Sequence, residues 1–166
     1  EEAVVRGRWL MAADKERAKL LSLFGDLPPR DYMVFSRLID KEVSDGMIRE
    51  KLVLDLNGIE PVPALFILPQ EVTGKIPVVL YNHSHGGRYH VGKSEVLTGA
   101  PYLYEKPYAQ ELTAAGYGVL AIDAWGFGER RGRTEQEIFK EMLWKGQAMW
   151  GMMVYDSIKA VDYLLT

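Results

Sequence analysis

The hydrophobic positions in the second half of the chain form two near-continuous apolar runs. Residues 76–82 read IPVVLYN and residues 117–124 read YGVLAIDA. Such runs are typical of parallel strands that are buried on both faces of a sheet. A helical pattern over residues 106–115, ended by Gly116, lies between them. This order predicts a strand, a crossover helix and a second parallel strand, joined in the right-handed sense.

A strand pair is predicted before these two runs. Residues 48–56 alternate between apolar and polar side chains, and residues 62–68 are rich in side chains that suit a pleated surface. The Asn-Gly pair that follows the first segment is a strong signal for a tight turn, so we expect an antiparallel hairpin. Pro61 and Pro63 lack a backbone N–H, which favours an edge or a bulge for the start of the second strand. We therefore expect this hairpin at one margin of the sheet.

Helical patterns are concentrated at the two ends of the chain. Residues 12–24 combine good helix formers with an apolar stripe, and the mixed segment 32–40 predicts a short second helix. Residues 134–165 predict a long helical region that opens with a capping box formed by Thr134 and Glu137. Glycines at positions 146 and 151 favour its division into two helices.

Composition places the chain among ordinary globular proteins and excludes several function classes. Of its 166 residues, 48% are hydrophobic and 26% are charged, and the formal net charge is −3. The longest basic cluster is Arg130, Arg131 and Arg133, which we interpret as a solvated turn, with contact to an anion or a substrate as the alternative. Because the net charge is negative and no longer block of like charge exists, we expect no nucleic-acid partner. The absence of cysteine excludes disulfides, thiolate metal sites and a cysteine nucleophile.

Domain organisation is predicted from the absence of repeats, low-complexity tracts and linkers. We expect a single domain that consists of an N-terminal helical extension over residues 1–47 and a core over residues 48–166. No apolar run approaches about 18 residues, the length that a membrane-spanning helix needs, and no signal peptide is visible. We therefore expect a cytoplasmic location and no membrane partner.

The loop after the first apolar run carries the candidate chemistry. It lies at the carboxyl end of a predicted buried parallel strand, which is where ligands bind in open α/β sheets. Two adjacent glycines allow a sharp backbone turn and leave N–H groups toward the crevice, and a tetrahedral oxyanion needs such donors. The loop reads His83-Ser84-His85-Gly86-Gly87-Arg88-Tyr89-His90.

This loop resembles the HGGG-type loop of the α/β-hydrolase superfamily, which supplies one half of the oxyanion hole. The resemblance implies that a backbone N–H of His85, Gly86 or Gly87 binds the oxyanion. If His83 aligns with the histidine of the family, the donors are His85 and Gly86. If His85 aligns with it, the donors are Gly87 and Arg88.

A second motif follows the next predicted strand and resembles the D-x-x-G-x-G turn of the same family. Asp123, Gly126 and Gly128 occupy its fixed positions. The resemblance implies a structural turn in which Asp123 holds the loop by hydrogen bonds rather than taking part in catalysis. Four side chains near the two motifs are candidates for the walls of a substrate pocket: Arg88, Tyr89, Trp125 and Phe127.

Together the motifs cover about residues 50–166 and are most similar to acetyl-xylan-esterase-like and dienelactone-hydrolase-like members. The resemblance implies an α/β fold: the N-terminal half of an α/β-hydrolase, with an antiparallel hairpin, parallel strands and crossover helices. It also implies a serine hydrolase that acts on a small-molecule ester without a cofactor.

The nucleophile elbow of the family, G-x-S-x-G, is absent from this sequence. Ser84 has Gly86 two residues after it but Asn82 two residues before it. We therefore expect the chain to be truncated before the nucleophile strand. The serine, acid and histidine are expected beyond Thr166, so the 166 residues alone are expected to be inactive.

Two other readings stay open. His83, His85 and His90 resemble the start of the H-x-H-x-D-H signature of metallo-β-lactamase-like hydrolases, but its acid and second imidazole positions are Gly87 and Arg88. We therefore expect no metal.

The third reading is a non-catalytic assembly or binding module. In α/β-hydrolases the strand at residues 76–82 pairs with the nucleophile strand, so without that partner a central edge lies open. We expect this edge to associate with the missing half or with another copy of the chain.

Overall fold

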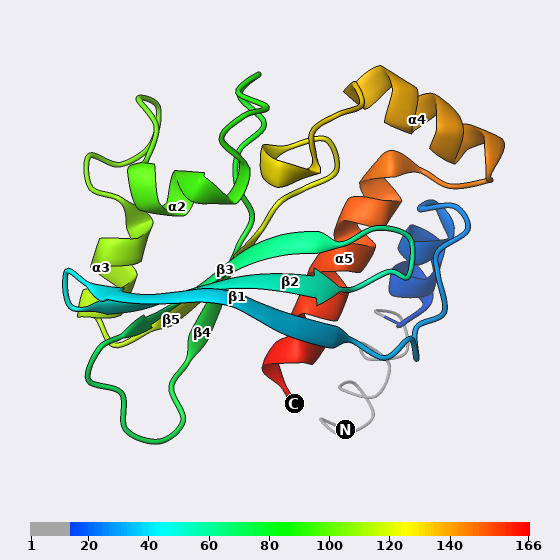
Figure 1. Cartoon of the computed structure of the whole chain (residues 1–166). Coiled ribbons are helices and arrows are strands. Elements are labelled where there is room, and N and C mark those ends of the chain that lie inside the picture. Colours follow the sequence, from blue (N-terminus) through cyan, green and yellow to red (C-terminus); the bar gives the residue numbers. More distant parts are fainter. Residues whose placement is uncertain (1–13) are drawn as a thin grey trace, which may run out of the picture.

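The computed structural model describes residues 14–166 and is built around one five-stranded sheet (Figure 1). The spatial order is β1-β2-β3-β5-β4, in which β4 and β5 are parallel and every other pair of neighbours is antiparallel. The strands are β1 (Phe35–Ser44), β2 (Met47–Asp55), β3 (Val62–Pro69), β4 (Val78–Tyr81) and β5 (Gly118–Ile122).

The segment 32–40, predicted as a short helix, is instead the start of strand β1. β1 pairs with β2 through a two-residue turn at Asp45 and Gly46, with one irregularity in register between Leu38 and Asp40. Their φ angles of 52° and 72° are those of a type I′ hairpin turn. β1 is exposed at the outer edge, so no face of it is buried and its sequence shows no alternation. Pairing with β2 therefore decides its structure, and the predicted extension over 1–47 contains a strand of the sheet.

The predicted antiparallel pairing of β2 and β3 is confirmed, but the pair lies inside the sheet rather than at its margin. Pro63 is tolerated there because the ladder between β3 and β5 begins one residue later, at Ala64 and Ile122. The Pro63 carbonyl, on the same side, accepts from the Asp123 amide at 3.0 Å. The missing N–H therefore lies where no partner strand needs it.

The predicted parallel crossover is also confirmed. Between β4 and β5 the chain forms the 3-10 turn η1 (Gly92–Ser94), α2 (Glu95–Thr98) and α3 (Tyr108–Ala114), of which only α3 was predicted. β5 is buried along its whole length, whereas β4 is half-buried because it has one neighbour strand.

The predicted division of the last helical region is correct, and only one of the two glycines causes it. The 3-10 turn η2 (Gly128–Arg130) precedes α4 (Glu135–Trp144), which begins with the predicted capping box and is followed by α5 (Met149–Leu164). Gly146, with a φ of 72°, lies in the break. Gly151 lies within α5, where a side chain would overlap the backbone of Phe24.

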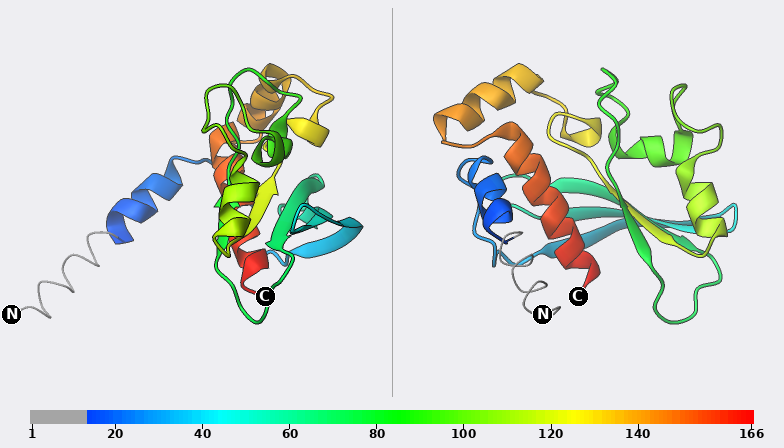
Figure 2. Two further views of the ribbon diagram at one scale, coloured as in Figure 1. Left: turned by 90° about the vertical axis from the view of Figure 1, so that its left-hand side faces the viewer. Right: turned by 180° about the vertical axis from the view of Figure 1, so that it is seen from behind.

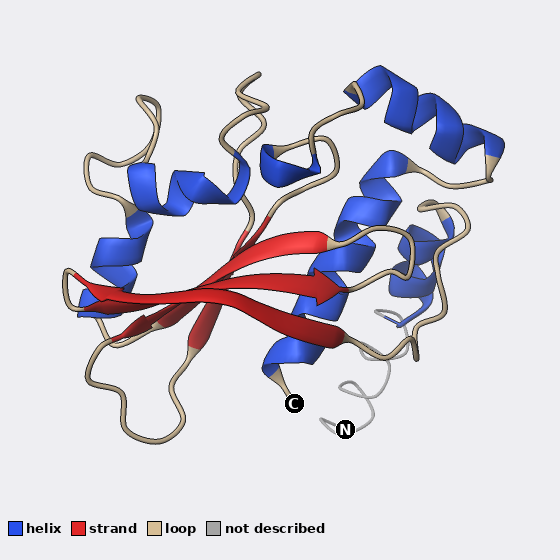
Figure 3. Ribbon diagram, viewed as in Figure 1, coloured by secondary structure: helices blue, strands red, loops and turns tan. Residues whose placement is uncertain are grey.

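Helices cover both faces of the sheet (Figures 2 and 3). α5 packs against one face through Ala160, which belongs to one apolar cluster with Leu54 and Leu120. α2 and α3 cover the other face, where Val96 and Ala109 belong to a second cluster. The result is a three-layer α/β/α arrangement with its core on the strands β2, β3 and β5.

The N-terminal part of the described chain is helical over residues 14–22 and projects from the sheet (Figure 2). The first two residues of the helix predicted over 12–24 lie outside the described residues. Within residues 14–166, no helix combines the length and apolar character that crossing a bilayer requires.

Candidate functional site

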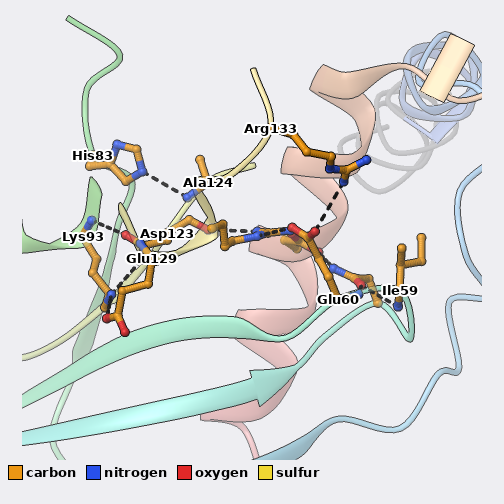
Figure 4. A network of polar contacts seen from close by, with 11 residues as sticks. Ile59, Glu60, His83, Lys93, Asp123, Ala124, Glu129 and Arg133 are labelled. Carbon is orange, nitrogen blue, oxygen red and sulfur yellow. Dashed lines mark hydrogen bonds and ion pairs between the residues drawn. The ribbon is translucent and has the colours of Figure 1, made fainter. Parts of the chain in front are cut away.

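The loops that follow β4 and β5 meet at one edge of the sheet, because carboxyl ends of parallel neighbours lie side by side. Asp123, directly after β5, is the fixed point between them (Figure 4). Its fully buried carboxylate accepts from the amide and the ammonium of Lys93, each at 2.7 Å, and from the amide of Glu129 at 2.9 Å. The carboxylate therefore holds the turn of its own loop and the start of the crossover segment.

His83 makes a second connection between the two loops (Figure 4). Its Nε2 accepts from the amide of Ala124 at 3.0 Å, and its Nδ1 lies 3.1 Å from the carbonyl of Ser84. An accepting Nε2 leaves the proton on Nδ1, which donates to that carbonyl. Both ring nitrogens of His83 are thus engaged. Within residues 14–166, no three His, Asp or Glu side chains converge in a way that could hold a metal ion.

Glu95 holds the glycine loop from the opposite side. Its Oε1 accepts from the Tyr81 hydroxyl at 2.8 Å and from the Ser84 amide at 2.9 Å. Its Oε2 accepts from the Ser84 hydroxyl and from the Tyr102 hydroxyl. Burial alone would raise the pKa of Glu95, but these donors together lower it below its ordinary value.

Some amides of the glycine loop donate within the loop itself. The Arg88 amide donates to the His85 carbonyl at 3.2 Å, and the Gly87 amide makes a long contact of 3.4 Å with the His85 ring. Within the described residues, the amides of His85 and Gly86 donate to no acceptor. Gly86 has a φ of 46°, which favours glycine, and a Cβ there would lie 2.5 Å from the Tyr102 hydroxyl and displace it.

A cavity of about 1040 Å³ lies beside the loop, between the outer edge of β4 and the helices α4 and α5. Its walls include His83, His85 and Phe127 together with apolar side chains of α5. Of the four predicted pocket residues, Phe127 contributes to this cavity. Tyr89 lines a smaller hollow at the start of α4, and Trp125 lies in the core, 2% exposed. Arg88 contacts neither space, so the structure brings the four together only in part.

Glu135, the first residue of α4, is a member of the site that the sequence did not single out. Its carboxylate accepts from the Tyr89 hydroxyl at 2.5 Å and lies 3.3 Å from Nε2 of His85. The hydrogen bond from Tyr89 lowers the pKa of Glu135, and the same bond raises the pKa of Tyr89. Glu95 was missed as well. The sequence carries one signal near Glu135, the capping box that begins at Thr134, and it carries no signal for Glu95.

Arg130 is buried, so its interpretation as part of a solvated turn is wrong. Its guanidinium donates to the Asp156 carboxylate at 2.9 Å and to the Glu60 carboxylate at 2.7 Å. It also stacks on the Trp125 ring, with 4.2 Å from Cζ to the ring centre. This contact explains why Trp125 belongs to the packing beneath the loop and not to a pocket wall.

Comparison with known proteins identifies the fold to which this site belongs. No family model matches the chain. A relative from Bacillus subtilis (strain 168), described as "Putative hydrolase YtaP", is 52% identical over 150 residues, which are 90% of this chain and 50% of the relative. The crystal structure of a "putative acetyl xylan esterase" from Bacteroides fragilis matches with a TM-score of 0.65 and 18% identity. That match covers 95% of this chain and 42% of the other. The chain has the α/β-hydrolase fold.

The fold expected from the motifs is therefore confirmed. The chain spans about half the length of the curated relative it matches, and its partial coverage of the solved structure fits half of an α/β-hydrolase. Both loops contribute to the same cavity, the glycine loop after β4 through His83 and His85 and the loop after β5 through Phe127.

Acidification is expected to weaken the loops through Glu129. The hydrogen bond from the Lys93 ammonium, at 2.6 Å, lowers the pKa of Glu129 below its ordinary value of 4.5. A carboxyl with a lower pKa in the folded state contributes stability above its unfolded pKa and loses it as pH falls through the folded pKa. Glu129→Gln is therefore expected to lower the free energy of unfolding at pH 7, and this difference from the wild type shrinks toward pH 3.

Urea unfolding at both pH values measures that difference. Glu71→Gln is the matched control, because Glu71 is exposed and forms no ion pair within residues 14–166. A Glu129→Gln effect that is equal at both pH values would show that the Lys93 contact is not ionic.

Proposed function

We propose that this chain forms the oxyanion-hole half of a serine-dependent hydrolase that acts on carboxylic esters. The observation that carries the proposal is that the amides of His85 and Gly86, in the loop at the carboxyl end of β4, donate to no acceptor within the described residues. Backbone donors held in place before the reaction stabilise the negative charge that develops on an ester carbonyl oxygen. The names of the hydrolase relative and of the esterase neighbour support the same class.

The chemistry would follow acyl transfer. A serine outside these 166 residues attacks the ester carbon, a histidine takes the serine proton, and an acid orients that histidine. The carbonyl oxygen then carries negative charge and accepts hydrogen bonds from amides among His85, Gly86 and Gly87. Because Asp123 and Glu95 already hold the two loops, little rearrangement is needed as this charge forms.

The serines near the loop support a nucleophile from elsewhere in the protein. The Ser84 hydroxyl lies between the Glu95 carboxylate and the Tyr102 hydroxyl, and its amide is also used by Glu95. The Ser157 hydroxyl donates to the Met153 carbonyl of its own helix. Neither has the exposed position on a strand-to-helix turn that a nucleophile elbow provides.

Ester hydrolysis by the full-length protein tests the proposal. We expect hydrolysis of 4-nitrophenyl acetate, inactivation by a fluorophosphonate, and no turnover by the 166-residue chain as the matched control. A full-length protein that is active but resists the fluorophosphonate and loses activity in EDTA would contradict it. That outcome would favour metal-dependent hydrolysis through His83, His85 and His90.

We also propose that the outer edge of β4 associates with the remainder of the protein or with a second copy. β4 pairs only with β5, and its other side opens on the cavity whose walls include Leu80 and Val161. A strand edge that has no partner and lies next to apolar walls is a template for a further strand.

Light scattering tests this association. The 166-residue chain is expected to form dimers or larger species, and a separately expressed remainder is expected to convert them to a one-to-one complex. A monodisperse monomer that unfolds cooperatively would contradict the proposal.

A further inference from the structure

Glu95 is a buried carboxylate that forms no ion pair within the described residues. It is the first residue of α2 and is 2% exposed. The nearest cation in sequence, Lys93, directs its ammonium to Asp123 and Glu129 instead. A buried carboxylate is costly unless hydrogen bonds replace its hydration, so the donors around Glu95 are essential to its being there.

These donors come from three separate segments. Tyr81 is the last residue of β4, and Ser84 is the second residue of the loop 83–90. Tyr102 belongs to the connection between α2 and α3. The Ser84 and Tyr102 hydroxyls also lie 3.0 Å from each other. A single carboxylate therefore joins the end of the strand, the root of the glycine loop and the wall beside it.

The contacts of Glu95 set the course of the next two residues. Because the Ser84 amide and hydroxyl both donate to the carboxylate, Ser84 and the peptide unit between His83 and Ser84 have a fixed direction. The Ser84 carbonyl, which belongs to the next peptide unit, accepts from the His83 ring at 3.1 Å. Gly86 then lies against the Tyr102 hydroxyl. The same hydroxyl donates to the Glu95 carboxylate at 3.2 Å. The amides of His85 and Gly86, which donate to no acceptor within the described residues, immediately follow Ser84, the residue that Glu95 holds.

We propose that Glu95 is the positioning residue of the oxyanion loop, acting through Ser84 and Tyr102 to aim the amides of His85 and Gly86. This inference rests on the proposed function. It differs from a general role in folding, because a loop that is mispositioned loses contacts made in the transition state more than contacts made to the bound ester.

The kinetic test compares Glu95→Gln with the wild type in the full-length protein. A displaced catalytic group costs up to about 100-fold in rate, so kcat for 4-nitrophenyl acetate is expected to fall roughly 10–100-fold. KM is expected to stay within about twofold, since ground-state binding is little affected. Glu105→Gln, an exposed residue of the same connection, is the matched control.

Hydrogen exchange supplies a readout that does not depend on activity. In Glu95→Gln the amides of Ser84 and Arg88, which donate to Glu95 and to the His85 carbonyl, are expected to exchange at least about tenfold faster, while those of β5 keep their protection. Unchanged exchange together with unchanged kcat would overturn the inference, as would a variant that raises KM and leaves kcat alone. If the wild type hydrolyses no ester, the proposed function fails, and the exchange of Ser84 and Arg88 alone decides whether Glu95 positions the loop.

Discussion

Gly128→Ala is expected to destabilise the protein strongly. The added methyl group would overlap the buried carboxylate of Asp123, which is held on three sides by Lys93 and Glu129. Gly128 also has a φ of 53°, which costs a side-chain-bearing residue about 1–2 kcal/mol. Overpacking adds about 1–3 kcal/mol, so we expect a total loss of about 2–5 kcal/mol.

Gly74→Ala separates the two causes. Gly74 has a φ of 74°, but no atom lies within 4 Å of a Cβ built there, so it carries the conformational cost without the overlap. Urea unfolding is expected to give a loss of about 1–2 kcal/mol for this variant. Equal losses for Gly128→Ala and Gly74→Ala would mean that the Asp123 carboxylate is not fixed where the structure has it.

Arg130→Met is the second large expected effect. It leaves Asp156 buried, 1% exposed, with Asn57 donating at 2.7 Å and no cation in contact. Removing one partner of a buried ion pair costs about 3–5 kcal/mol, because the other charge stays without compensation. The loss of the Glu60 contact and of stacking on Trp125 acts in the same direction.

The pH dependence of Arg130→Met identifies the cause. Burial raises the pKa of Asp156 and Arg130 opposes that rise, so the variant raises the pKa further. The folded variant then binds a proton that the unfolded chain releases, and its stability increases as pH falls. Urea unfolding is expected to show a smaller deficit at pH 5 than at pH 8. The exposed Arg37→Met, on β1, is the control, and a pH-independent deficit would contradict the ionic explanation.

The sequence predicts the parts of this fold whose residues pack in a regular pattern. β5 is recognisable because both of its faces are buried, and α4 because its capping box is local. β1 is not recognisable, since its structure comes from pairing with β2 at an exposed edge. Pro63 predicts an edge strand, but β3 lies inside the sheet. Its position is explained by the ladder between β3 and β5, which begins only at Ala64.

The site divides in the same way. The glycines of the loop are visible in the sequence because their backbone angles require that residue type, as at Gly86. Glu95 and Arg130 are ordinary surface-type residues in the sequence, and their burial depends on donors and acceptors that the fold brings from distant segments. Trp125 looks like a pocket wall until the structure shows that Arg130 stacks on it.

The most direct test of the account is a crystal structure of the full-length protein after reaction with a fluorophosphonate. Its phosphonyl oxygen occupies the place of the oxyanion, and we expect it within about 2.7–3.1 Å of a backbone nitrogen among residues 85–87. The label is expected on a serine outside these 166 residues. A phosphonyl oxygen that contacts no amide of this loop, or a label on a residue of this chain, would contradict the account.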